Sequence, residues 1–335
     1  MFSALNLKKV SALGLLCGAG LALGVTPPVY SQTGAPRVDA KIEAYKATSA
    51  VSGNLKSIGS DTMNNLMTLW AEGFNKFYPS VKVEIEGKGS ATAPAALVEA
   101  TAHFGPMSRP MKGDELDKFE KKFGYKPTAI KTSVDVLAVY VHRDNPIKAL
   151  SLQQVDAIFS KTRRGGGTKD LKTWGDLGLT GEWAAKPISV YGRNSASGTY
   201  GYFKEHALFK GDYKDEVKEQ PGSSAVVQGV ASDKFAIGYS GIGYKTPDVR
   251  AVPISVKTGD EAYEATMENA YSGDYPISRY LILYVNKDPK RDLEPLRREF
   301  LRYVLCREGQ EVVVKDGYIP LPANVIAAER KAAGL

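Results

Sequence analysis

Strands and helices alternate along most of this chain. Residues 81–87 switch strictly between apolar and polar side chains, which predicts a half-exposed strand. Residues 133–142 and 278–286 are mostly apolar, which is typical of strands buried on both faces. Residues 64–79 predict a helix and residues 293–317 one long closing helix. The first helix carries an apolar face made of Leu66, Trp70, Phe74 and Phe77.

This alternation predicts an α/β fold with mainly parallel sheets flanked by helices. The length of 335 residues is enough for two domains that each bury a core. In open sheets of this kind, ligands bind at the carboxyl ends of the strands, where loops lead into helices. The loops that follow the strands are therefore the place to look for chemistry.

The N-terminal residues differ from the rest. Residues 1–31 combine two lysines and no acid with an apolar run and a small residue before Gln32, which predicts a cleavable secretory signal. Leu16 precedes Cys17 where a lipoprotein signal needs a small side chain, so lipidation is not expected. Residues 32–52 are polar and weakly patterned, and we expect an extended arm there. The processed protein is expected to be soluble because no later stretch is long and apolar enough to span a membrane.

Charge and cysteine content narrow the function further. Removing the signal leaves 42 basic and 37 acidic residues, a net charge of +5. This excess suits a surface that handles anions but is too dispersed for nucleic-acid binding. Cys306 is then the one remaining cysteine, so no internal disulfide can form.

Glycine and hydroxyl residues gather in loops at 59–63, 87–92 and 194–199, each between a predicted strand and a predicted helix. The first amides of a helix lack partners and the helix dipole is positive there, so an oxyanion is a natural ligand. Any one of these residues could simply cap its helix. Three such loops, with Arg193 beside the last, favour a shared anion because a guanidinium matches a tetrahedral oxyanion. Arg109 follows another strand, where a surface ion pair and a ligand contact are equally compatible with the sequence.

Sequence signatures of enzymes are mostly missing. The three histidines are scattered, and no nucleophile elbow or complete phosphate-binding loop of the nucleotide-hydrolase type occurs. We therefore predict a protein that is not an enzyme and needs no cofactor or metal. A secreted phosphatase or phosphoryl-transfer enzyme is the alternative, and it would need a metal cluster or an activated nucleophile. A secreted adhesion protein on the same fold also remains open.

Ordered motifs over residues 50–325 carry a family resemblance. They are IGSDTMNNLMTLWAEGF, GKGSATAPAAL, SVDVLAVYVHRDNP, YGRNSASGTY and AIGYSGIGY. The chain resembles the periplasmic phosphate-binding proteins of bacterial high-affinity phosphate ABC transporters, a type II periplasmic binding protein family. The spacing Arg193-x-x-x-Ser197-Gly198-Thr199 matches the family's phosphate loop at every position.

The resemblance implies two α/β lobes that close on one phosphate ion. It places lobe 1 at 50–140 plus 251–335 and lobe 2 at 141–250. It also implies a location in the periplasm and delivery of inorganic phosphate to an inner-membrane permease by a monomer that does not bind nucleic acid. Sulfate or another oxyanion is the alternative ligand. The phosphate contacts it implies are Asp61, Thr62, Ser90, Arg109, Arg193, Ser197, Gly198 and Thr199.

One position departs from the commoner family pattern. Many members carry an aspartate that accepts the phosphate proton, where this chain has Arg109. We expect Asp61 to accept that proton instead, with Arg109 holding the ionised carboxylate or touching the ligand. The competing interpretation is that Asp61 caps the helix that follows it.

Overall fold

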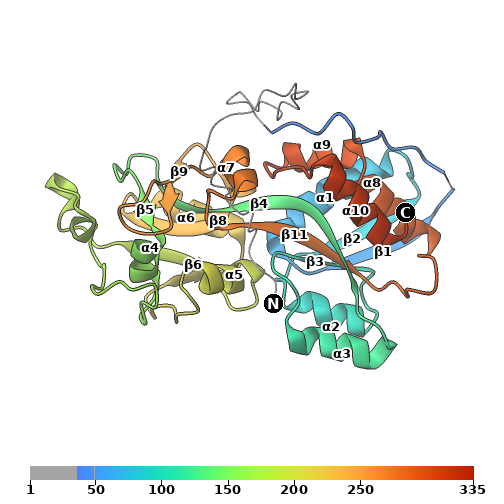
Figure 1. Ribbon diagram of the computed structural model, residues 1–335, viewed down its shortest axis with the longest axis horizontal. Coiled ribbons are helices and arrows are strands. Elements are labelled where there is room, and N and C mark those ends of the chain that lie inside the picture. Colours follow the sequence, from blue (N-terminus) through green and yellow to red (C-terminus); the bar gives the residue numbers. More distant parts are fainter. Residues whose placement is uncertain (1–35, 49) are drawn as a thin grey trace, which may run out of the picture.

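The computed structural model describes residues 36–48 and 50–335, and Figure 1 shows its two lobes side by side. The predicted signal at 1–31 lies outside the described residues. One continuous order of strands, β2-β1-β3-β11-β4-β8-β6-β7, runs through both lobes, and β9 also pairs with β4. The chain therefore has the predicted two-lobed α/β fold.

In lobe 1, helices cover both faces of the sheet (Figure 1). Its strands are β1 (Gly53–Ile58), β2 (Val81–Glu86), β3 (Phe104–Met107), β11 (Ser278–Val285) and the first part of β4 (Thr128–His142). Its helices are α1 (Asn64–Asn75), α2 (Thr92–Val98), α3 (Gly113–Phe123), α8 (Pro295–Val304), α9 (Arg307–Lys315) and α10 (Ala323–Ala333). Short 3-10 turn η1 (Asp61–Met63) joins β1 to α1.

Lobe 2 is built around the last part of β4. Its other strands are β5 (Leu150–Ser151), β6 (Ser189–Arg193), β7 (Lys218–Gln220), β8 (Ala236–Gly241), β9 (Val249–Ala251) and β10 (Ile254–Ser255). Its helices are α4 (Leu152–Phe159), α5 (Gly198–His206) and α6 (Ser223–Ser232), and α7 (Met267–Ser272) also contacts β4. The 3-10 turns are η2 (Trp174–Leu177), η3 (Gly181–Trp183) and η4 (Ile242–Tyr244).

Parallel pairing is confined to part of each sheet. β1 pairs in parallel with β2 and β3, and β6 does so with β7 and β8. The long strands β4 and β11 pair antiparallel with their neighbours. An antiparallel pair can join the two lobes directly, because β4 and β11 cross the molecule in opposite directions. The sheets are therefore mixed rather than mainly parallel.

The lobe boundaries differ from those implied by the resemblance. β4 belongs to both lobes, since residues up to Val136 pair with β11 and Leu137 onward pairs with β8. β10 pairs with β5, so residues 254–255 lie in lobe 2 rather than in lobe 1. The chain returns to lobe 1 at about the start of β11, where Ser278 lies opposite Val136.

Residues 293–317 form two helices rather than one. α8 ends at Val304, and Cys306 caps α9 by accepting a hydrogen bond from the amide of Gly309. A Cβ atom at Gly309 would lie 2.1 Å from the carbonyl oxygen of Tyr303, so only glycine allows this sharp turn. The apolar periodicity continues across the turn because both helices cover the same core.

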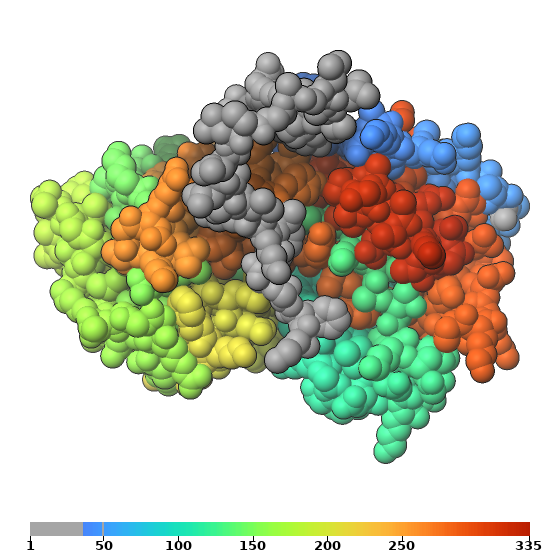
Figure 2. All heavy atoms as spheres, viewed as in Figure 1, coloured from blue at the N-terminus to red at the C-terminus, as the bar shows by residue number. Residues whose placement is uncertain are grey.

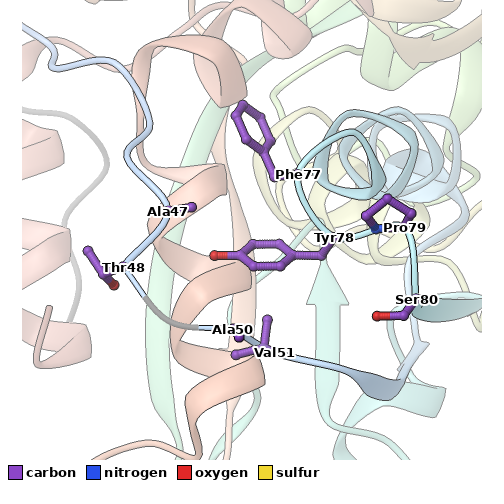
Figure 3. A pocket seen from close by; sticks show the side chains of 8 residues that line it. All are labelled: Ala47, Thr48, Ala50, Val51, Phe77, Tyr78, Pro79 and Ser80. Carbon is purple, nitrogen blue, oxygen red and sulfur yellow. The ribbon is translucent and has the colours of Figure 1, made fainter.

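The N-terminal arm packs on lobe 1. Its residues 36–48 contain no helix or strand, yet Ile42 and Tyr45 are buried in the core. The amide of Arg307 donates to the carbonyl oxygen of Glu43, and Figure 2 shows the blue arm beside the red C-terminal helices. A groove of about 460 Å³ runs between the arm and the α1–β2 loop (Figure 3), lined by Ala47, Thr48, Ala50, Val51, Phe77, Tyr78, Pro79 and Ser80.

Phe77 is the exception on the predicted face of the first helix. Leu66, Trp70 and Phe74 are fully buried, whereas Phe77 is 42% exposed. α1 ends at Asn75, so Phe77 no longer follows the helical repeat and packs edge-on against Tyr45 of the arm.

Candidate functional site

Loops from both lobes meet between the sheets. From lobe 1 come η1, the loop that precedes α2, and the residues that follow β3; from lobe 2 come the N-terminus of α5 and the loop before α6. The amide of Ala91 donates to the carbonyl oxygen of Ala196 across this seam, at 3.1 Å. The loops singled out in the sequence are thus brought together.

Buried hydroxyl groups line the seam. Ser60, Ser90 and Ser108 of lobe 1 are 0–1% exposed, and the Oγ of Ser108 lies 3.0 Å from that of Ser60 and 3.3 Å from that of Ser90. The Oγ1 of Thr62 in lobe 1 lies 2.8 Å from the Oγ1 of Thr199 in lobe 2, within hydrogen-bond distance. Buried hydroxyls need partners, and each can donate one proton while accepting others. The seam therefore concentrates adjustable hydrogen-bond donors.

Glycine permits this close approach. A Cβ atom at Gly198 would lie 2.2 Å from the Oγ of Ser90 and 2.6 Å from that of Ser108. Gly89, whose φ is +109°, faces the carbonyl oxygen of Ala196, and a Cβ there would lie 2.5 Å away. Any side chain at Gly198 would push the lobes apart, which accounts for glycine at that point of the loop.

The N-terminus of α5 begins at the predicted phosphate loop. Ser197 is its N-cap, and its Oγ accepts hydrogen bonds from the amides of Thr199 and Tyr200 at 3.1 and 3.3 Å. Ser197 thus has a capping role of its own. Its side chain also contributes to the polar lining because the residue is buried beside Gly198 and Thr199.

Arg193 ends β6 and is 2% exposed. Its Nη1 donates to the Oγ of Ser223 at 2.7 Å and lies 3.2 Å from the carboxylate of Asp61, while its Nη2 donates to the carbonyl oxygen of Pro221. Its buried Nε has no hydrogen-bond partner among the described residues. Burial lowers the pKa of Arg193, and the nearby Asp61 opposes that shift. A buried guanidinium with an unused donor is a strong feature of an anion site.

Asp61 reaches from lobe 1 into lobe 2. Its Oδ2 accepts the amide of Ser223 at 2.8 Å and pairs with Arg193, and its backbone oxygen accepts the hydroxyl of Tyr244 at 2.9 Å. Ser223 is the first residue of α6, so the carboxylate caps a helix of the opposite lobe. The interpretation of Asp61 as a cap for the helix that follows it is wrong, because its side chain makes no such hydrogen bond.

Arg109 forms an ion pair, one of the two outcomes that the sequence allowed, but the pair is buried rather than at the surface. Its two terminal nitrogens bind both carboxylate oxygens of Glu115 at 2.8 and 2.7 Å, and Nη1 also donates to the carbonyl oxygen of Pro110. Burial raises the pKa of Glu115, but the hydrogen bonds from Arg109 and Lys112 outweigh it and leave the pKa lowered. The expectation that Arg109 holds the carboxylate of Asp61 is wrong, since Arg193 takes that place. Arg109 therefore pairs with an acid only six residues later in the chain, at the start of α3.

Sequence reasoning missed a second buried arginine at the seam. Arg279 is 4% exposed and binds the Oδ2 of Asp135 through Nε and Nη2, at 3.0 and 2.8 Å. Its other hydrogen bonds go to the carbonyl oxygen of Ser108 and to the Oγ1 of Thr199, at 2.7 and 2.9 Å. The available signal was one acid and one arginine inside two otherwise apolar strands.

Other site types find no support in the described part of the chain. No group of three or more histidine, cysteine, aspartate or glutamate residues there could hold a metal ion. Among the same residues, no helix is both long and apolar enough to cross a bilayer. Cys306 is buried, and burial raises the pKa of its thiol to about 12, which is unlike a nucleophile.

Comparisons with known proteins agree with this arrangement. A family model described as a PBP superfamily domain matches residues 44–308. The phosphate-binding protein PstS of Pseudomonas aeruginosa is 57% identical over 298 residues, which cover 89% of this chain and 92% of that protein. The phosphate-binding protein PstS of Staphylococcus haemolyticus is 28% identical, covering 84% and 85%. The chain therefore belongs to the PBP superfamily and, within it, to the family of the phosphate-binding protein PstS.

Solved structures show the same fold. A substrate-binding protein assigned to phosphate ABC transport in Clostridium perfringens, crystallised with phosphate, superimposes with a TM-score of 0.69. It is 27% identical, and the match covers 80% of this chain and all of that one. An ABC-type phosphate transport receptor from Vibrio cholerae, 21% identical, superimposes with a TM-score of 0.60, covering 80% of this chain and 100% of that chain.

Proposed function

We propose that this protein binds inorganic phosphate between its lobes and delivers it to an ABC transporter permease without catalysing a reaction. The observation that carries the proposal is Arg193, buried at the seam with an Nε donor that no described residue uses. A buried cation with a spare donor is satisfied by an oxyanion. The names of the relatives, phosphate-binding proteins PstS, favour phosphate as that oxyanion.

We assign the phosphate contacts to both lobes. Lobe 1 supplies Asp61, Thr62 and Ser90, and lobe 2 supplies Arg193 with the α5 start. The α5 residues are Ser197, Gly198 and Thr199. All but Asp61 are buried where the loops converge, which supports a site that excludes water. We leave Arg109 out because Glu115 occupies both ends of its guanidinium.

Asp61 is the acid in this set, and we propose that it reads the phosphate proton. At neutral pH phosphate carries a proton, whereas sulfate carries none, so a carboxylate accepts from the first and repels the second. Both interactions of the Asp61 side chain with Arg193 and Ser223 use Oδ2. We propose that the other oxygen of this carboxylate, Oδ1, accepts the hydrogen bond from the phosphate.

Export to the periplasm, action as a monomer and independence from nucleic acid complete the proposal. Export rests on the signal-like residues 1–31, independence from nucleic acid rests on the modest, dispersed charge of the chain, and action as a monomer is carried over from the family resemblance. A phosphatase would need a metal cluster or an activated nucleophile, and the described residues offer neither a metal cluster nor a reactive cysteine.

Isothermal calorimetry with orthophosphate tests the proposed function. The expected result is saturable 1:1 binding that arsenate competes for and sulfate does not. Incubation with a chromogenic phosphate ester in the same buffer should release no product. Absence of orthophosphate binding, or sulfate binding in preference to it, would contradict the proposal.

A further inference from the structure

The second buried arginine has contacts that a purely structural ion pair does not need. Arg279 is the second residue of β11 and lies opposite Asp135 of β4, where the two long strands pass between the lobes. Beyond that pair, Arg279 donates to the backbone oxygen of Ser108 in lobe 1 and to the side-chain hydroxyl of Thr199 in lobe 2. One guanidinium therefore touches both sides of the seam.

Asp135 fixes the direction of this guanidinium. Its Oδ2 accepts from two nitrogens of Arg279, and its Oδ1 accepts the amide of Ile242 at 3.1 Å. Asp135 is fully buried, and a Cβ atom at Gly241 would lie 2.9 Å from its Oδ1. The carboxylate cannot rotate without losing these bonds, so the fork of Arg279 stays aimed at Thr199.

The hydrogen bond from Arg279 sets the polarity of the threonine pair. Thr199 Oγ1 accepts from Nη2, which leaves its own proton to be donated elsewhere. The Oγ1 of Thr62 lies 2.8 Å away, and we assign it as the acceptor of that proton. A Thr62 hydroxyl that accepts from Thr199 is in turn left with its proton to donate. The order Arg279, Thr199, Thr62 thus ends in a hydroxyl that needs an acceptor.

We infer that Arg279, held by Asp135, is a positioning residue that fixes Thr199 as a donor to Thr62 and so makes the Thr62 hydroxyl a hydrogen-bond donor toward the bound anion. The inference rests on the proposed function and deepens it, because it assigns unprotonated oxygens of the ion to the threonine side. The protonated oxygen of hydrogen phosphate then faces the carboxylate of Asp61. Arg279 acts through Thr199, whose hydroxyl it orients.

A double-mutant cycle tests this coupling. One arm is Thr199→Val, which removes the hydroxyl and keeps the shape. The other is Asp135→Asn with Arg279→Gln, a neutral pair that leaves no lone buried charge and a side chain too short to reach Thr199. Each arm should weaken orthophosphate binding by about 10- to 100-fold in calorimetry, the range for a hydrogen bond to a charged group.

The decisive result is the combined variant. If Arg279 acts through Thr199, the triple variant should bind no more than about threefold more weakly than Thr199→Val alone, because coupled residues are not additive. A pair that only stabilises the fold would lower the melting temperature and add its full effect to that of Thr199→Val. Full additivity, or a neutral pair whose affinity stays within about twofold of wild type, would overturn the inference.

The chain offers a matched control pair. Arg109 and Glu115 form another buried, two-pronged ion pair in lobe 1, and neither makes a hydrogen bond to Thr199. Arg109→Gln with Glu115→Gln should show no coupling to Thr199→Val. If the Asp135 and Arg279 pair fails to fold when neutral, Arg279→Lys replaces it with the same expected coupling. Wild type that fails to bind orthophosphate contradicts the proposed function itself, whereas wild-type binding with additive effects overturns this inference alone.

Discussion

Arg109, two residues after β3, and Arg193, the last residue of β6, are both buried arginines, yet their surroundings differ. Arg109 gives both terminal nitrogens to Glu115, an acid six residues later in the same lobe. Arg193 contacts Asp61 of the opposite lobe and keeps an Nε donor without a partner in the described chain. A guanidinium already matched by a carboxylate stabilises its own lobe, whereas one with a spare donor is poised for a ligand.

Replacing Arg193 should have the largest effect of all. Arg193→Ala removes the buried cation and should weaken phosphate binding by about 2–5 kcal/mol, the range for truncating one member of a buried charge pair. Arg193→Lys restores charge without the planar fork and should recover only part of this loss. Calorimetry of the two variants measures it, and near-normal affinity in the alanine variant would remove Arg193 from the site.

Replacing Arg109 tests the other half of the comparison. Arg109→Gln leaves the carboxylate of Glu115 buried without its partner, so the free energy of unfolding should fall by about 2–4 kcal/mol. Phosphate affinity should change far less than in the Arg193 variants. Urea unfolding and calorimetry on the same preparation give both numbers. Loss of affinity with unchanged stability would mean that Arg109 contacts the ligand after all.

Replacing Asp61 by asparagine tests whether its charge or its capping hydrogen bond matters for phosphate binding. Asp61→Asn can still accept the amide of Ser223 but carries no charge, so we expect about tenfold weaker phosphate binding and measurably better sulfate binding. A competition titration with both ions measures the ratio of the two affinities. A ratio equal to that of the wild-type protein would assign Asp61 to helix capping alone.

Asp316 differs from Glu115 and Asp61 because its buried carboxyl group has no arginine partner in the described chain. Burial raises its pKa to about 6 even though Asn65 donates a hydrogen bond to it. An unfolded aspartate titrates near about 3.9, so the native state holds the proton more tightly and loses stability as pH rises from about 4 through about 6. Asp316→Asn should therefore gain about 1–2 kcal/mol relative to wild type between pH 4 and pH 7. Urea unfolding at both pH values measures this, and a difference independent of pH would contradict it.

Much of the fold could be predicted because the periodicity of side chains reports burial locally. The strands at 81–86 and 278–285 lie where the pattern placed them, and the helix predicted from residue 64 begins at that residue. The apolar run of β4 gave no hint that it changes partners between Val136 and Leu137, because both halves are equally buried. Likewise, the turn at Cys306 interrupts a helix without interrupting the apolar pattern.

The site was predictable where its chemistry is local and hidden where it depends on long-range pairing. At the start of α5, the glycine and hydroxyl residues are adjacent in the sequence and by themselves indicate an anion-binding helix N-terminus. The partner of Arg109 is six residues away, so this ion pair could have been predicted from the local sequence. The partner of Arg279 is 144 residues away. No spacing rule connects Asp135 with Arg279, and the single charge within each apolar strand was the clue that both needed a partner.

We propose that the anion is held between the lobes, with Asp61 and Thr62 on one side and Arg193 and Thr199 on the other. Small-angle X-ray scattering with and without orthophosphate tests this most directly. If the ion completes a site shared by both lobes, the saturated protein should have a smaller radius of gyration than the phosphate-free protein. Identical scattering profiles, at a saturation that calorimetry has established, would place the site within a single lobe and rule out a site shared by both.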